Sequence, residues 1–292
     1  MTNIYEEKIL DAHMHIWDLN HGDYPWLQEP NPAVTKWIGS YKKICKNFLI
    51  DDYVDLIQPY NVSKCVHIEA NAAPEKALHE TKWLQKIADA HGFPHAIIPY
   101  ADLRDPDIEN ILKDLCQFPN VRGIRQTLLD SDLALDLRWQ RGLKFFATQQ
   151  LIFELSIFDY QIPDIVPVVK AHDDVLFVLG HLGWPLDVSL TGLEKWKQNL
   201  SLLATCPNVY LKLNGIGLIL KKSDSENVMR FLHAGIEIFG ENRCFFGSNM
   251  PTDLLFLNYK QIMALFKETL SVYNLKTQRK IFYENAKDFY DI

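Results

Sequence analysis

The chain has 292 residues, and its 48% hydrophobic content is enough for a large buried core within one α/β unit. A formal net charge of -7 argues against nucleic acid or an anionic membrane as a partner. No apolar run approaches the roughly 18 residues that a membrane helix needs. The five cysteines form no Cys-x-x-Cys pair, and no basic stretch followed by an apolar one opens the sequence. We therefore expect reduced thiols and a cytoplasmic location.

Short apolar runs alternate with longer amphipathic stretches along the whole chain. The apolar runs are mostly continuous, as expected for parallel strands that are covered on both faces. They span residues 9–16, 65–70, 95–101, 121–128, 151–158, 175–182, 209–215 and 244–248. The amphipathic stretches, which we expect to be helices, span residues 51–59, 75–91, 105–116, 136–149, 163–171, 193–205, 225–239, 258–272 and 276–288.

This alternation predicts a single-domain (β/α)8 TIM barrel over residues 1–292. An open doubly wound sheet is the alternative. It is disfavoured for nucleotide binding because no Gly-x-Gly-x-x-Gly follows any of the runs. Residues 19–48 are irregular and follow the first expected strand, so we expect them to form a rim or lid over the mouth of the barrel.

The first apolar run carries the motif Asp11-Ala12-His13-Met14-His15. Side chains alternate faces along a strand, so a regular strand would point Asp11, His13 and His15 to the same side. Two imidazoles and a carboxylate on one face can bind a divalent metal or polarise a carbonyl group. The structural alternative is a pair of surface histidines beside a buried aspartate.

In a TIM barrel the chemistry lies at the carboxyl ends of the strands, and polar residues follow most of the expected strands. Of these, His181 is the hardest to explain by structure alone. It ends an apolar run, and burying a polar ring without a partner is costly. The other polar residues at strand ends are His67, Glu69, Tyr100, Asp102, Arg122, Arg125, Glu154, Asp159, Lys212, Asn214, Asn249 and Asp253.

The segments that carry these residues resemble the amidohydrolase superfamily along nearly the whole chain. The resemblance is strongest to the lactonase branch, which includes 2-pyrone-4,6-dicarboxylate lactonase, fuconolactonase and rhamnonolactonase. The matching segments are residues 11–18, 22–27, 66–69, 121–126, 178–183, 209–213, 246–251 and 285–290.

The resemblance implies a hydrolase that opens a small sugar-acid or dicarboxylate lactone, with an anionic or hydroxylated small molecule as its partner. His13, His15 and His181 would polarise the ester carbonyl, either directly or as ligands of one divalent metal such as zinc. Arg125 would hold a carboxylate or hydroxyl of the substrate, a role suited to its planar donor fork. We expect three further residues in the substrate site, namely Glu69, Glu154 and Trp184.

Other activities and assemblies fit the same resemblance. A zinc-dependent decarboxylase, an amide hydrolase and a weakly active ligand-binding homologue are the alternatives to a lactonase. The sequence is also compatible with an oligomer.

The chain departs from the superfamily pattern after the eighth strand, where the usual Gly-Ser-Asp reads Gly247-Ser248-Asn249. An asparagine amide has no accessible proton-accepting state, so Asn249 cannot be a general base, although it can hydrogen-bond a water or the substrate. Another group could supply the base, the reaction could differ, or the protein could bind a ligand and turn it over poorly. The candidate bases are Asp253, Asp159, Glu154 and His181.

Overall fold

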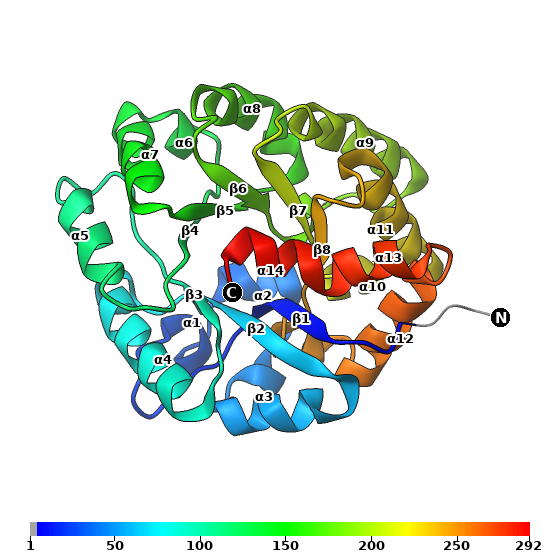
Figure 1. Cartoon of the computed structure of the whole chain (residues 1–292), viewed down its shortest axis with the longest axis horizontal. Coiled ribbons are helices and arrows are strands. Elements are labelled where there is room, and N and C mark those ends of the chain that lie inside the picture. The colour runs from blue at the N-terminus through cyan, green and yellow to red at the C-terminus, as the bar shows by residue number, and fades with distance from the viewer. Residues whose placement is uncertain (1–4) are drawn as a thin grey trace.

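The computed structural model describes residues 5–292, in which eight parallel strands close into a barrel surrounded by helices (Figure 1). The strands are β1 (Ile9–Met14), β2 (Val62–Ile68), β3 (Ala96–Ile98), β4 (Gly123–Thr127), β5 (Ile152–Ser156), β6 (Leu176–Leu179), β7 (Val209–Leu213) and β8 (Cys244–Phe246). Hydrogen bonds order them as β1-β2-β3 and β4-β5-β6-β7-β8. Isolated bridges from Ile97 to Val121 and from Met14 to Met250 join these two sets. The predicted TIM barrel is thus confirmed.

Helices follow the strands at the predicted positions, and Gly92 ends α4 with a φ of 74°, as a helix-terminating glycine does. The outer helices are α3 (Ile50–Ile57), α4 (Ala77–His91), α5 (Ile108–Leu115), α7 (Leu137–Gln149), α8 (Ile162–Ala171), α9 (Leu190–Ala204), α11 (Ser225–Phe239) and α12 (Tyr259–Leu270). Short helices are α6 (Asp132–Leu135), α10 (Gly217–Leu220), α13 (Leu275–Arg279) and α14 (Asn285–Tyr290). Within residues 5–292, none of the helices has the length and apolar character that crossing a membrane requires.

The helix α14 closes one end of the barrel (Figure 1). Its Phe289 and Tyr290 pack into an apolar cluster inside the barrel together with residues of the strands. The strand residues in this cluster are Leu10, Ala12, Val66, Ile68, Ala96, Ile98, Ile152, Val178 and Phe245. Because this end is filled with apolar side chains, the polar side chains of the barrel interior gather toward the opposite end.

The strand β1 is not regular. Its register against β2 shifts between Asp11 and Met14, so one extra residue lies on the β1 side. The Asp11 carboxylate accepts a hydrogen bond from the Tyr53 hydroxyl of α3 at 2.9 Å and one from the Ser248 backbone N–H at 2.7 Å. The expectation that Asp11 shares a face with His13 and His15 was therefore wrong. The bulge turns the two histidines inward, while Asp11 fastens β1 to α3 and to the segment after β8.

Residues 19–48, called the rim segment below, contain α1 (Pro25–Gln28), α2 (Pro32–Ile38) and the short helix η1 (Lys42–Ile44). The two ends of the segment are joined where Trp17 and Phe48 exchange backbone hydrogen bonds of 2.9 and 3.1 Å. The Trp26 indole donates to the Ala70 carbonyl at 2.8 Å and fastens the segment to the loop after β2.

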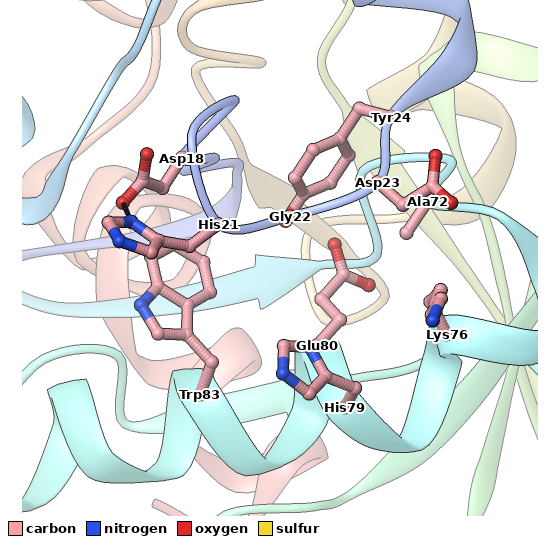
Figure 2. Close-up of a pocket in the computed structure, with 10 residues that line it drawn as sticks. All are labelled: Asp18, His21, Gly22, Asp23, Tyr24, Ala72, Lys76, His79, Glu80 and Trp83. Atoms are coloured by element: carbon pink, nitrogen blue, oxygen red, sulfur yellow. Dashed lines mark hydrogen bonds and ion pairs between the residues drawn. The ribbon is translucent and has the colours of Figure 1, made fainter.

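A small hollow of about 30 Å³ lies between the start of the rim segment and α4. Figure 2 shows Glu80 pointing from α4 toward Tyr24, with Trp83 on the same helix. The Glu80 carboxyl is hydrogen-bonded to the Tyr24 hydroxyl and to the Ala70 backbone N–H. Burial raises the pKa of Glu80 to about 8, so this carboxyl stays protonated in the folded protein at neutral pH.

We expect Glu80→Gln to stabilise the protein increasingly as pH rises from about 4.5 to about 8. In this window the unfolded chain has lost the Glu80 proton and the folded chain has kept it, so the free energy of unfolding falls with rising pH. A glutamine at position 80 does not titrate, so the free energy of unfolding of the variant does not fall for this reason. Thermal unfolding of both proteins from pH 5 to 8.5 measures the effect, and a constant difference in melting temperature would contradict it.

Candidate active site

A cavity of about 650 Å³ opens at the carboxyl ends of the strands, beneath the rim segment. Residues at or just beyond the ends of β1, β4, β6 and β8 give it a polar floor, formed by His15, Arg125, His181, Asn249 and Asp253. Aromatic side chains, among them Trp26, Trp37 and Trp184, line its walls. The structure therefore brings together in one cavity six of the residues that the sequence singled out as candidates.

His13 and His15 form a contact pair, with their Nε2 atoms 3.2 Å apart. The His15 Nδ1 atom lies 2.8 Å from the Ile68 carbonyl oxygen, which can only accept a hydrogen bond. His15 must therefore carry its proton on Nδ1, and its Nε2 accepts a hydrogen bond from the Nε2–H of His13. Burial holds the pKa values of both rings well below their usual range, so both are neutral at pH 7.

Behind His13 lies an ion pair between Lys212 and Glu154 that was not predicted, although Glu154 itself was expected in the substrate site. The Lys212 ammonium donates to the Glu154 carboxylate at 2.8 Å, and it lies 3.4 Å from the Nδ1 atom of His13. Both side chains are fully buried, and burial lowers the pKa of Lys212 to about 8. The signal in the sequence was the lysine itself, because a lysine inside an apolar strand is rare unless it is paired.

The two histidines also fit a divalent ion. Two nitrogens bound to one tetrahedral zinc lie roughly 3.3 Å apart, close to the separation seen here. Binding would move the His13 proton to Nδ1, which faces the Glu154 Oε1 atom at 3.2 Å. That oxygen is buried and has no hydrogen bond within the described structure, so it is free to accept this proton.

The expected third ligand, His181, lies beside His13 with 4.6 Å between ring centroids. Nevertheless, in residues 5–292 no three His, Cys, Asp or Glu side chains are placed so that they could hold one metal ion. The chain thus offers a two-nitrogen site rather than a complete three-residue one.

The backbone around His181 is strained. His181, Leu182 and Trp184 all have positive φ angles, between 45° and 55°. Residues other than glycine rarely adopt such angles. The turn stacks the Trp184 indole on the His181 ring at a centroid distance of 3.8 Å. It also leaves the His181 Nδ1 atom buried without a hydrogen bond in the described structure. A strained turn that presents an unpaired polar ring at a cavity is typical of a functional site.

Arg125 reaches the cavity from β4, and Glu69 holds it there. Its Nε donates to the Glu69 carboxylate at 2.7 Å, and its Nη2 donates to the Glu69 carbonyl at 2.8 Å. The other Glu69 carboxylate oxygen accepts from the Asn71 backbone N–H at 2.6 Å. Within the described residues, the Arg125 Nη1 donors have no hydrogen-bond partner and can serve a ligand, whereas Glu69 lies behind the lining of the cavity.

Asn249 and Asp253 form a second contact pair on the floor. The Asn249 amide donates to one Asp253 oxygen at 2.9 Å, and the Gly217 backbone N–H donates to the other at 3.1 Å. Burial raises the pKa of Asp253 to about 7, although both hydrogen bonds act in the opposite direction. A carboxyl group with such a pKa can both take and give a proton at neutral pH.

The predicted site residues thus fall into two layers. Those that line the cavity are His15, Arg125, His181, Trp184, Asn249 and Asp253. His13, Glu69 and Glu154 are buried directly behind them and contact them or Lys212. The residue Asp159, considered as a possible base, is not among those that line the cavity.

Comparison with known proteins decides the family. Residues 10–292 match the model of the amidohydrolase family. The chain belongs to this family. It is 33% identical to the uncharacterized protein y4mH of Sinorhizobium fredii, over 97% of this chain and 98% of that protein.

Two further matches come from Burkholderia multivorans, one among curated proteins and one among solved structures. An L-fucono-1,5-lactonase is 26% identical over 88% of this chain and 86% of that protein. The solved structure of an amidohydrolase with bound zinc superposes with a TM-score of 0.85 at 24% identity, covering 98% of this chain and 99% of that one.

We expect Gly215→Ala to lower activity on the order of 10²-fold, because a displaced active-site group costs about that much. Gly215 has a φ of 68°, and an added Cβ would lie 2.7 Å from the Cδ2 atom of His181. Gly92→Ala is the matched control, since Gly92 has a φ of 74° and open space around it. Both variants carry the backbone cost, about 1 kcal/mol, but only the first moves His181. Equal activity of the two variants would contradict this role of Gly215.

Proposed function

We propose that the protein hydrolyses the internal ester of a small lactone. The observation that carries this proposal is the position of the Asp253 carboxyl group, which lines the cavity together with hydrogen-bond donors, and burial raises its pKa to about 7. The lactonases among its relatives support the same chemistry.

In the first step, the Asp253 carboxylate takes a proton from a water molecule, and the oxygen of that water attacks the ester carbon. The Asn249 amide, which contacts Asp253 at 2.9 Å, orients the carboxylate and the water. Negative charge then develops on the former carbonyl oxygen. The free Nη1 donors of Arg125 and an N–H of the neutral His181 ring stabilise it.

In the second step, the tetrahedral intermediate collapses and the bond from the ester carbon to the ring oxygen breaks. The leaving alkoxide takes the proton that Asp253 holds, so Asp253 returns to its starting state. The product is an open-chain hydroxy acid, which releases one proton at neutral pH.

We further propose that His13 and His15 hold one divalent ion through their Nε2 atoms, with the Glu154 carboxylate fixing the His13 ring and Lys212 holding Glu154 in place. When bound, such an ion would supply Lewis-acid polarisation of the ester carbonyl. The roles of His15, His181, Trp184 and Arg125 as cavity-lining groups do not depend on the ion.

The composition of the floor favours a hydroxylated lactone over a dicarboxylate. Arg125 is the one lysine or arginine among the described residues that line the cavity, and Glu69 already offsets its charge. Two substrate carboxylates would therefore meet one side-chain cation that is already paired, and Asp253 would add repulsion.

We expect Asp253→Asn to lower kcat/KM for lactone opening by about 10²–10⁴-fold. In the unaltered protein, kcat/KM should rise with pH and level off above about 7, because Asp253 must be ionised to accept a proton. Proton release from a panel of lactones between pH 5 and 9 measures both effects.

Asp159→Asn is the control, since this half-buried carboxyl lies outside the cavity lining and should leave the rate unchanged. A pH profile with no inflection near 7 would remove Asp253 as the base. A gain of activity in Asn249→Asp would favour the alternative of a ligand-binding homologue with little turnover.

For the metal, we expect chelator-treated protein to take up one equivalent of zinc, and His15→Ala to lose this uptake. His79→Ala is the control, because His79 lies at the small hollow beside α4 (Figure 2). Metal analysis after gel filtration gives the stoichiometry independently of activity. Full lactone hydrolysis by protein that takes up no zinc would refute the metal site and leave the proposed hydrolysis standing.

A further inference from the structure

The large cavity has two zones of opposite chemistry. The polar floor at the strand ends holds the groups assigned to the reaction. The walls beyond it come from the rim segment and from the loops after other strands, and they are mostly apolar. Their apolar side chains include Trp26, Val34, Trp37, Ile38, Leu129, Phe158, Leu218 and Phe256.

The cavity is larger than a simple sugar lactone needs. A volume of about 650 Å³ would hold roughly 20 water molecules at about 30 Å³ each. A six-carbon sugar lactone has twelve non-hydrogen atoms, and bonded atoms lie closer together than water molecules do. Such a substrate on the floor would therefore leave about half of the cavity empty, next to the apolar walls.

One wall runs directly from the floor to the rim. The Trp184 indole stacks on His181, and the ring of Trp37 lies 4.6 Å from that of Trp184 and 5.8 Å from that of Phe158. Trp37 is 40% exposed although it is a large apolar residue. A group attached to a lactone ring on the floor would follow this aromatic wall outward.

The aromatic part of the wall disfavours polar and charged groups. Outside the floor, five uncharged polar residues also line the cavity, namely Asn31, Asn71, Thr127, Ser156 and Thr252, but the ring faces of Trp37, Phe158 and Trp184 offer no hydrogen-bonding groups. A hydroxyl held against these faces would lose its hydrogen bonds to water without replacement. The one arginine of the lining is at the floor and is paired with Glu69, so a carboxylate held along the wall would find no cation. A group that binds along these ring faces is therefore favoured when it is neutral and apolar.

We propose that the substrate is a lactone with an apolar alkyl or aryl substituent of about five carbons or more, which binds along the wall of Trp37, Phe158 and Trp184. This proposal rests on the proposed lactone hydrolysis for its reaction. The new proposal adds which part of the substrate the cavity recognises.

The direct test compares δ-decalactone, which carries a five-carbon tail, with δ-valerolactone, which has the same ring without the tail. Each buried methylene contributes about fourfold, so we expect kcat/KM to be at least about tenfold higher for δ-decalactone. Equal values would overturn the apolar substituent while leaving lactone hydrolysis intact.

A binding measurement separates this proposal from the reaction itself. The matching lactams, 6-pentyl-2-piperidone and 2-piperidone, offer the same shapes with an amide in place of the ester. Calorimetry should show at least about tenfold tighter binding of the tailed lactam. If no lactone is opened but the tailed lactam binds tighter, the reaction is wrong and the apolar zone stands. If both lactams bind equally, the apolar zone is wrong.

Trp37→Ala should lower the ratio of kcat/KM for δ-decalactone to kcat/KM for δ-valerolactone. It should also lower the ratio of the association constant of the tailed lactam to that of the untailed lactam. Trp83→Ala is the matched control, because Trp83 lies on α4 at the small hollow and does not line the large cavity (Figure 2). A preference that persists unchanged in Trp37→Ala would overturn the assignment of this wall.

Discussion

Inside the barrel, the Lys212 ammonium and the Glu154 carboxylate meet at 2.8 Å, and neither side chain is exposed. Removing one partner of such a pair leaves an uncompensated buried charge, which costs about 3–5 kcal/mol. The pair stands between the two ends of the barrel. On one side the ammonium lies 5.6 Å from the ring centroid of Tyr290 in the closing helix, and on the other side it reaches His13. The orientation of His13, and through it that of His15, depends on this pair.

The mouth of the barrel is built where the backbone departs from regular structure. The bulge in β1 separates the structural carboxylate of Asp11 from the side chains of His13 and His15. The run of positive φ angles after β6 presents His181 and Trp184 to the cavity. Asn249 also has a positive φ, of 58°, a conformation that asparagine tolerates better than most residues. These departures cost free energy, and the closed barrel around them supplies the rigidity that maintains them.

Much of this arrangement could be predicted from the sequence, because it follows from periodicity. Eight continuous apolar runs between amphipathic stretches leave few folds other than a TIM barrel, and the polar residues at strand ends then belong to its mouth. The division of these residues into two layers could not be predicted. It depends on which partner each side chain meets across the barrel, as Glu69 meets Arg125 and Glu154 meets Lys212. The bulge in β1 could not be predicted either, because the alternation of side chains between two faces is inferred from a sequence on the assumption that the strand is regular.

The backbone bridge between Trp17 and Phe48 makes the rim segment a closed loop on the barrel, with both of its ends fixed at one place. Insertions, deletions or exchanges between these two residues can change the wall of the cavity while the strands and the floor keep their positions. In evolutionary terms, the part of substrate recognition that lies in the rim segment can change separately from the bond-breaking chemistry of the floor. New specificities can therefore arise in this scaffold through changes in one short loop, without a search for a new catalytic arrangement.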